Sequence, residues 1–224
     1  MSQRSYKQIC GLAQGLDLIG ERWTLLVIRE LLFGPKRFGA LKEALPGISA
    51  NLLSARLHSL ANAGVVESVS LPPPAEGVSA YALTERGEGL REPVAALSLW
   101  GMDLLEPEKQ LAAGYTARAS LYAGTRMAAA QRDSTLDGLP RLTLSCEVDG
   151  EQFVIAIDGR GSGSVRHGVA DDADAELRCD LPRWFSLIAE GSPLDPSDEG
   201  EASALPAAAL LEALAEPVVA PPPD

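Results

Sequence analysis

Short polar side chains and one guanidinium share a face of the segment 50–62. The face consists of Asn51, Ser54, Ala55, Arg56, His58 and Ser59. Amide, hydroxyl and guanidinium groups hydrogen-bond to base edges and to phosphate oxygens. The segment therefore has the side chains expected of a helix that reads nucleic acid.

Two helices that meet at a tight turn must position this face. The first carries an apolar stripe at helical spacing, made of Phe38, Leu41 and Leu45. Pro46 and Gly47 then break the pattern. The second helix has its own stripe of Leu53, Leu57 and Leu60, which is predicted to pack on the first. Ser49 is predicted to cap this second helix by accepting a hydrogen bond from a free amide, and Gly64 ends it.

A β-hairpin is predicted after the two helices. Its strands cover residues 65–71 and 78–83, and the loop Pro-Pro-Pro-Ala-Glu-Gly joins them. Two helices followed by a hairpin indicate a winged helix-turn-helix, whose second helix enters the major groove of DNA. A helical pair that only builds a core is the alternative that apolar spacing permits.

Contacts with the DNA backbone are expected on both sides of the reading helix. Lys36 and Arg37 are candidates for phosphate contacts, with an ion pair inside the chain as the alternative for Arg37. Ser79 in the second strand is a candidate for backbone or minor-groove contact. His58 lies late in the helix and is expected to point to solvent or phosphate. The predicted DNA-binding residues are Lys36, Arg37, Ser49, Ala50, Asn51, Ser54, Arg56, His58 and Ser79.

Residues Ile9 to about Leu105 resemble the HxlR-type family of winged-helix transcriptional regulators. The matching residues are Cys10, Asp17-Leu18-Ile19-Gly20, Arg22-Trp23-Thr24-Leu25-Leu26, Leu31-Leu32-Phe33-Gly34, Arg37-Phe38, Leu41, Ile48-Ser49, Leu53, Arg56-Leu57, Leu60, Gly64-Val65-Val66, Tyr81, Leu83-Thr84 and Gly87. The resemblance implies a cytoplasmic homodimer that binds operator DNA. The family often has a basic residue near the wing tip, and this loop has none.

Two further helical segments are predicted within residues 5–32, with Trp23 as a core anchor and Arg29 and Glu30 on a solvent-exposed face. A longer apolar stripe starts from a cap at Thr84 and comprises Leu90, Val94, Leu97, Trp100 and Leu104. The resemblance implies that this helix joins the N-terminal helix in a dimer interface, whose candidates are Cys10, Leu97, Trp100 and Leu104. Packing within the subunit is the alternative.

Cys10 has two interpretations. The resemblance implies that a cysteine at this place is, in some members, a redox or electrophile sensor. Such chemistry requires a thiolate, which a helix N-terminus or nearby cations favour. The other interpretation is a small apolar residue in the dimer interface.

The net charge of −12 is unevenly distributed. Residues 1–100 contain 10 Lys and Arg and 9 Asp and Glu, whereas residues 101–224 contain 9 and 22. The acidic excess therefore lies outside the predicted DNA-binding domain. No apolar run spans a membrane and no signal peptide is recognised, so a cytoplasmic protein without membrane contact is expected. The three cysteines, Cys10, Cys146 and Cys179, are too scattered for a disulfide framework or a zinc site.

Residues 141–216 have the pattern of a second domain. Four short alternating strands are predicted near 142–146, 153–157, 164–169 and 175–179, forming an antiparallel sheet. Helices at 182–190 and 207–215 follow. The Pro-rich stretch 217–224 is expected to be disordered.

This second segment resembles sterol carrier protein type 2-like domains. The matching features are Asp149-Gly150 between strands, the step Asp174-Ala175 into a strand, the helix with Trp184, Leu187 and Ile188, and Gly191. The resemblance implies an apolar tunnel for a hydrophobic molecule, with Phe153, Ile155, Trp184, Leu187 and Ile188 as candidate ligand-binding residues. A filled core is the alternative, because apolar alternation is the same in both.

No catalytic motif is recognised. Gly159, Gly161 and Gly163 do not precede a helix, and no Gly-Lys-Ser/Thr follows, so they do not indicate a phosphate loop. The aspartates at 171, 172 and 174 lack the glycine and terminal glutamate of a calcium loop. His167 has no neighbouring nucleophile or metal partner in sequence. Neither an enzyme nor a cofactor is expected.

The sequence thus predicts an α+β protein with four parts. These are a winged helix-turn-helix DNA-binding and dimerisation domain (1–106), a helical connector (107–140), a sterol-carrier-like domain with an antiparallel sheet and flanking helices (141–216), and a tail (217–224). The function expected is a homodimeric regulator of a pseudo-palindromic operator, modulated by a hydrophobic small molecule. The alternatives are a redox or electrophile sensor acting through Cys10, and a lipid-carrier or interaction protein without specific DNA binding.

Overall fold

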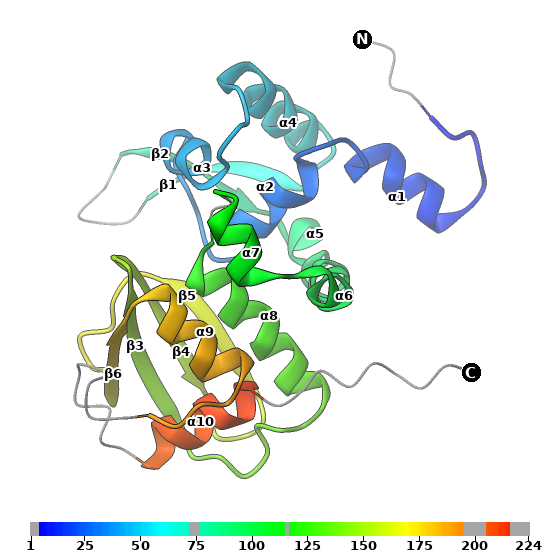
Figure 1. The fold of residues 1–224 in the computed structure, drawn as a ribbon. Helices are drawn as coiled ribbons and strands as arrows, with labels where there is room; N and C mark the ends of the chain where they lie inside the picture. Colours follow the sequence, from blue (N-terminus) through cyan, green and yellow to red (C-terminus); the bar gives the residue numbers. More distant parts are fainter. Residues whose placement is uncertain (1–4, 72–76, 115–116, 195–204, 216–224) are drawn as a thin grey trace. The chain divides into compact units, whose positions relative to one another are not determined.

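The computed structural model describes residues 5–71, 77–114, 117–194 and 205–215. The chain is α+β and forms two compact units, Met1–Val94 (unit 1) and Ala95–Asp224 (unit 2) (Figure 1). The division falls inside helix α6 (Arg91–Gly101). The predicted tail and the wing residues 72–76 lie outside the described residues. No helix of the described ranges is long and apolar enough to cross a membrane.

Unit 1 contains the predicted helical pair and hairpin. Its elements are α1 (Gly11–Ile19), α2 (Thr24–Leu31), α3 (Phe38–Ala44), α4 (Ala50–Asn62), β1 (Val66–Ser70), β2 (Ser79–Leu83) and α5 (Glu85–Glu88). Leu41 and Leu45 of the first stripe and the three leucines of α4 are buried in one core with α2, as the apolar spacing predicted, and Phe38 packs against this core partly buried. The strands pair antiparallel, from Val66↔Leu83 to Ser70↔Ser79. The prediction of a helix-turn-helix followed by a hairpin is confirmed.

The turn between α3 and α4 depends on Gly47. This residue has φ +91°, a conformation that side chains with a Cβ rarely adopt. A Cβ at Gly47 would also lie 3.6 Å from Cη2 of Trp23, whose ring packs at the turn. Trp23 itself has a left-handed backbone (φ 78°) before α2, and its side chain packs against the core of unit 1. The ring of Trp23 thus lies beside the turn that precedes α4.

The apolar stripe from Thr84 to Leu104 is divided among three elements rather than one helix. Thr84 caps α5 as predicted, since its Oγ1 accepts a hydrogen bond from the Gly87 amide at 3.1 Å. Gly87 packs so tightly that an added Cβ would lie 2.2 Å from the Val65 carbonyl oxygen. The chain turns after α5, and α6 and the 3-10 helix η1 (Met102–Leu104) follow.

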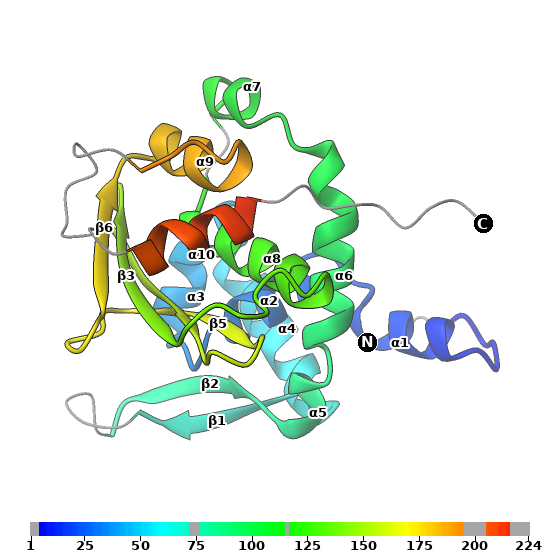
Figure 2. The ribbon, with the colours of Figure 1, turned by 90° about the horizontal axis from the view of Figure 1, so that it is seen from below.

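Unit 2 contains a four-stranded sheet with the order β5-β4-β3-β6. Its elements after η1 are α7 (Pro107–Ala112), α8 (Ala119–Arg132), β3 (Leu142–Val148), β4 (Glu151–Ile157), β5 (Gly163–His167), β6 (Ala175–Cys179), α9 (Leu181–Ala189) and α10 (Leu205–Ala215). Helices α8, α9 and α10 cover one face of the sheet (Figure 2). Helix α8 lies within the segment interpreted as a connector and contributes Ala119, Ala123 and Met127 to the core of unit 2.

The prediction of an antiparallel sheet is wrong for its last strand. β3, β4 and β5 pair antiparallel, but β6 pairs parallel to β3, with Leu144↔Ala175 and Val148↔Cys179. The segment after β5 crosses to the far edge of the sheet instead of making a hairpin. Residue alternation reports which face a side chain occupies and not the direction of the strand, so the sequence contained no signal for this crossover.

Close packing and capping fix α8 and α10 on the sheet. Gly163 lets α8 approach β5, because a Cβ there would lie 2.3 Å from Sδ of Met127. The carbonyls at the end of α10 are capped by the Arg126 side chain, which donates to Leu214, and by the Thr135 hydroxyl, which donates to Ala213 at 3.2 Å. Burial lowers the pKa of Arg126.

Candidate nucleic-acid interface

Helix α4 presents a polar face to solvent and an apolar face to the core. Leu53, Leu57 and Leu60 are at most 2% exposed. Asn51, Ser54, Ala55, His58 and Ser59 are all exposed, as are Ser49 and Ala50 at the start of the helix. The exposed groups are an amide, hydroxyls and an imidazole on one side of a rigid helix. This arrangement permits direct contact with base edges in a groove.

The Ser49 cap defines where the reading helix begins. Its Oγ accepts a hydrogen bond from the Leu52 amide at 3.2 Å, and its backbone is extended, as a capping residue requires. The prediction that Ser49 caps this helix is confirmed. The cap fixes the first turn, which holds Asn51.

Loss of this cap is expected to destabilise unit 1. We expect Ser49→Ala to lower the free energy of unfolding of unit 1 by about 1 kcal/mol, because one amide of the first turn loses its acceptor. Ser59→Ala is the matched control, since Ser59 is an exposed serine inside the same helix. Urea unfolding of the two variants checks the difference. Equal midpoints for both variants would show that the cap does not stabilise α4.

Arg56 is held by an acidic residue from another segment. Its Nη2 lies 3.2 Å from Oε2 of Glu21, in the loop between α1 and α2, and its side chain is 19% exposed. Its Nε is buried and has no hydrogen-bond acceptor among the described residues. The guanidinium that the sequence placed on the reading face is thus directed along the protein surface toward Glu21. Glu21 and Arg56 are 35 positions apart, so no local pattern in the sequence indicates this pair.

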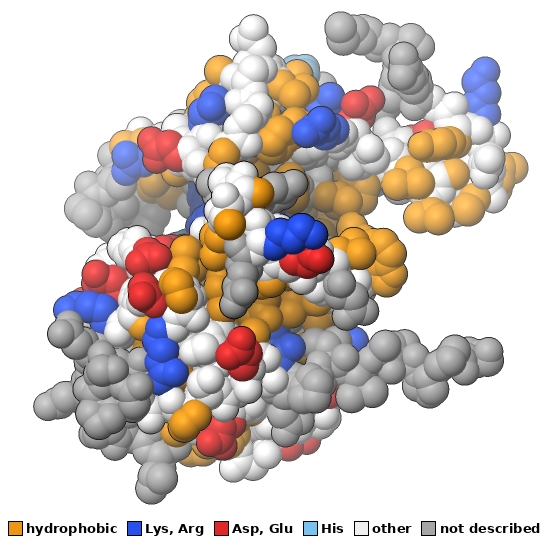
Figure 3. Space-filling view, viewed as in Figure 1, with side chains coloured by type: hydrophobic (Ala, Val, Ile, Leu, Met, Phe, Trp, Pro, Cys, Tyr) orange, Lys and Arg blue, Asp and Glu red, His pale blue; other side chains and the backbone are white. Residues whose placement is uncertain are grey.

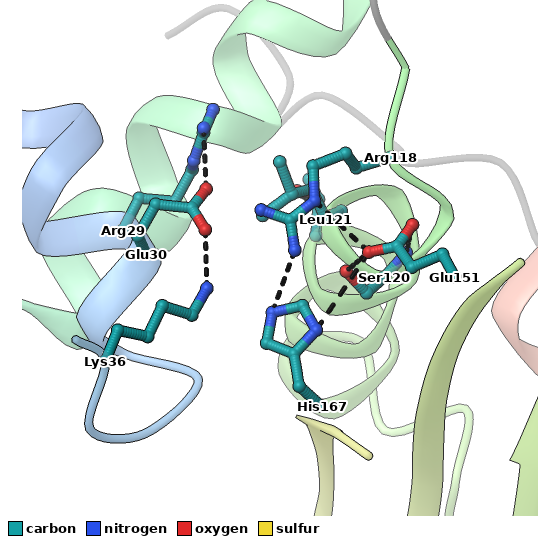
Figure 4. A network of polar contacts seen from close by, with 9 residues as sticks. Arg29, Glu30, Lys36, Arg118, Ser120, Leu121, Glu151 and His167 are labelled. Atoms are coloured by element: carbon teal, nitrogen blue, oxygen red, sulfur yellow. Dashed lines mark hydrogen bonds and ion pairs between the residues drawn. The ribbon is translucent and has the colours of Figure 1, made fainter. Parts of the chain in front are cut away.

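Lys36 also takes part in an ion pair within unit 1. Its Nζ lies 2.6 Å from Oε2 of Glu30, while Oε1 of Glu30 lies 2.9 Å from Nη2 of Arg29 (Figure 4). The backbone of Lys36 pairs with that of Tyr81 in β2, so this segment is fixed at both its main chain and its side chain.

The expectation that Glu30 faces solvent is wrong. Its side chain is fully buried, at 0% exposure. A carboxylate is stable at such a place only when it is paired and hydrogen-bonded, and Arg29 and Lys36 supply both. The sequence contained no signal for this, because Lys36 comes from the loop after α2.

Arg37 and Ser79 lie at the starts of α3 and β2. Arg37 is exposed at the N-cap position of α3, so its guanidinium is accessible to a phosphate. Ser79 is exposed in β2, and its hydroxyl lies 3.0 Å from that of Ser68 on β1.

The residues predicted for a dimer interface are all exposed. Cys10 is the exposed N-cap residue of α1. Leu97, Trp100 and Leu104 are 51%, 70% and 65% exposed, so packing within the subunit does not bury them. Helix α1 and the residues before it also expose apolar side chains, namely Tyr6, Ile9, Leu12 and Leu16. Figure 3 shows hydrophobic side chains gathered over α1.

The five residues predicted to bind a ligand come together in unit 2. Phe153 and Ile155 of β4 and Trp184, Leu187 and Ile188 of α9 belong to one buried core, and none is more than 1% exposed. The rings of Phe153 and Trp184 meet edge to face, with centroids 5.3 Å apart.

A polar cluster in unit 2 was not expected from the sequence. Oε1 of Glu151 accepts a hydrogen bond from the Ser120 hydroxyl at 2.5 Å and lies 3.2 Å from Nε of Arg118. Nη2 of Arg118 lies 3.1 Å from Nε2 of His167 (Figure 4). The serine contacts the carboxylate and not the imidazole, so the cluster lacks the order of a nucleophile–base–acid triad. No group of three or more metal-ligating side chains occurs in the described ranges.

Comparison with known proteins assigns the N-terminal part of the chain to a family. Residues 18–109 match the HxlR-like helix-turn-helix family. An uncharacterised HTH-type transcriptional regulator of Synechocystis is 37% identical over 103 residues, which are 45% of this chain and 73% of that protein. An uncharacterised HTH-type regulator of Mycobacterium tuberculosis is 41% identical over 92 residues, which are 41% of this chain and 57% of that protein.

A third relative has a solved structure with a bound small molecule. The HTH-type transcriptional regulator YodB of Bacillus subtilis is 37% identical over 91 residues, which are 41% of this chain and 80% of that protein. A quinone-bound crystal structure of YodB is 33% identical and covers 42% of this chain and 97% of its own, with a TM-score of 0.35. The chain belongs to the HxlR-like helix-turn-helix family of transcriptional regulators.

Proposed function

We propose that this protein is a homodimer that binds a pseudo-palindromic operator through α4 and responds to a hydrophobic small molecule bound in unit 2. The observation that carries the DNA-binding half is the exposed polar face of α4, directly opposite three buried leucines. Two such helices related by a twofold axis enter successive major grooves of a palindromic site.

Base contacts in this proposal come from the first half of α4. Asn51 and Ser54 are the exposed hydrogen-bonding side chains there, and an Asn side chain can bond to adenine through both its donor and its acceptor. Arg37 supplies a phosphate contact from the start of α3, and the exposed Ser79 supplies another from β2. Lys36 and Arg56 are ion-paired within the chain and contribute to the reader by fixing the loops beside α3 and α4.

With Lys36 and Arg56 ion-paired within unit 1, we expect few phosphate contacts and a shallow salt dependence of operator binding. Each neutralised phosphate contributes about 0.9 to the slope of log K against log salt concentration. We expect a slope of roughly −4 or shallower for the dimer, measured by fluorescence anisotropy from about 50 to 300 mM salt. A slope near −10 would contradict the arrangement of charges proposed here.

Dimerisation is supported by apolar side chains that a monomer leaves in water. Leu97, Trp100 and Leu104 are exposed along α6 and η1. Exposed apolar groups of this size are typical of a surface that another protein covers. The family resemblance assigns the C-terminal helix of the reader to this role.

Unit 2 is proposed to be a sterol-carrier-like domain that binds the effector. A sheet covered on one face by α8, α9 and α10 supports this proposal, as does the convergence of Phe153, Trp184 and Ile188 in its core. The effector would act by population shift, binding one arrangement of the two readers better than the other. A titration of operator affinity with apolar compounds tests this half, and no change with any compound would refute it.

A redox or electrophile switch at Cys10 is the second candidate. Two observations favour it: Cys10 is exposed at the N-terminus of α1, and the relative YodB has been solved with a bound quinone. Cys10→Ser should then abolish the response of operator binding to a quinone or to hydrogen peroxide. Cys179→Ser, which changes a half-buried thiol of unit 2, is the control. An unchanged response in Cys10→Ser would exclude the switch.

A further inference from the structure

The indole N–H of Trp184 is a buried donor that the protein does not satisfy. Trp184 is 0% exposed, and its Nε1 has no hydrogen-bond acceptor among the described residues. Buried N–H groups are nearly always paired, because an unpaired one loses its bond to water without compensation. Such a group in the core of unit 2 therefore requires an explanation.

The position of this N–H is set by two elements. Trp184 lies in the first turns of α9, a helix capped by Asp180, whose Oδ1 accepts from the Arg183 amide at 2.8 Å. The Trp184 ring packs edge to face against the ring of Phe153 of β4, at an interplanar angle of 79°. Helix and strand thus hold the indole in one orientation inside the apolar core.

The other buried polar side chains of unit 2 have partners in the protein. The hydroxyl of Ser120 donates to Glu151, and the guanidinium of Arg126 donates to the carbonyl of Leu214 at the end of α10. These groups stabilise the fold. The Trp184 N–H, by contrast, is fully buried and has no acceptor among the described residues.

We propose that Trp184 Nε1 donates a hydrogen bond to the effector, which is a neutral, mainly apolar molecule with an acceptor oxygen such as that of a ketone or ester. This inference rests on the proposed function of unit 2 as an apolar binding domain. In this proposal the hydrocarbon part is buried among apolar side chains of the core, and a single placed donor orients the molecule. An ionised ligand is disfavoured, since a buried charge requires an ionic partner and the core to which Trp184 belongs consists of apolar residues.

The test compares 2-octanone with octane, two probes of equal chain length that differ in one acceptor. Dissociation constants are measured for the full-length protein, for Trp184→Phe and for the control Phe185→Leu, by displacement of Nile red. We expect the preference for ketone over alkane to fall about tenfold in Trp184→Phe and to stay unchanged in Phe185→Leu. Phe185 lies on the same helix but contacts Tyr122 instead of Phe153.

The outcomes distinguish a failure of the Trp184 hydrogen bond from a failure of effector binding by unit 2. If both probes bind and the preference is the same in wild type and Trp184→Phe, the hydrogen bond is refuted while unit 2 remains a binding domain. If neither probe binds the wild-type protein, the effector-binding function fails and the inference fails with it.

A second measurement does not depend on the Trp184 variant. The three tryptophans give three indole ¹⁵N–¹H resonances, and Trp23→Phe and Trp100→Phe identify that of Trp184 by elimination. We expect 2-octanone to move the Trp184 proton resonance downfield and octane to leave it in place. The same shift with both compounds, or none with the ketone, would overturn the proposal.

Discussion

Ser54→Glu is expected to lower operator affinity at least about 100-fold. Ser54 is exposed on α4, on the face opposite the buried leucines. A carboxylate there would face the phosphate-lined groove, and a like charge at an interface costs several kcal/mol. The dimer carries the change twice. Even about 1.4 kcal/mol per subunit therefore gives a hundredfold loss, because each 1.4 kcal/mol is a factor of ten.

The controls test whether a carboxylate lowers operator affinity only when it is placed on α4. Ser164→Glu introduces the same carboxylate at an exposed position of β5 in unit 2 and should leave operator affinity within about twofold. Ser54→Ala removes only the hydroxyl and should cost less than the glutamate. Operator affinity is measured by fluorescence anisotropy at fixed salt. Equal affinity of Ser54→Glu and wild type would show that α4 does not enter the groove.

Trp100→Glu is expected to raise the dissociation constant of the dimer at least about 100-fold. Trp100 is 70% exposed in the single chain, and tryptophans at interface centres contribute more than most residues. A twofold interface contains two copies of each residue, so the loss of one aromatic contact and the burial of one charge both count twice. Sedimentation velocity over a range of protein concentrations measures the change.

The control for this variant is another exposed apolar residue. Val169 is 53% exposed in unit 2, and Val169→Glu adds the same charge outside α6 and η1. It should leave the dimer intact. If Trp100→Glu dimerises like wild type, α6 is not the interface, and the exposed apolar residues of α1 become the next candidates.

Local patterns in the sequence predicted most of the elements. The stripe of Leu53, Leu57 and Leu60, the serine before it and the two alternating strands after it all act over a few residues. The strands β1 and β2 were placed within one residue of their observed ends for this reason. The four strands and two final helices of unit 2 were likewise placed within about two residues.

The missed features depend on contacts that the helical and strand periodicity of the sequence does not show. Glu30 appeared to belong to a solvent-exposed face, but it is buried because Lys36 and Arg29 neutralise it. Arg56 was placed on the reading face, and its ion pair with Glu21 spans 35 positions. The parallel pairing of β6 with β3 arises from a crossover that no residue type encodes. In each case the partner, and not the residue itself, decides the structure.

A competition titration shows whether the exposed face of α4 reads a specific operator. The purified full-length protein is titrated onto the DNA upstream of its own gene, with an excess of unrelated competitor DNA and at several salt concentrations. We expect a discrete, competitor-resistant complex of one dimer per site, which Ser54→Glu does not form. Binding that competitor DNA abolishes, with no preference for any sequence, would contradict this expectation.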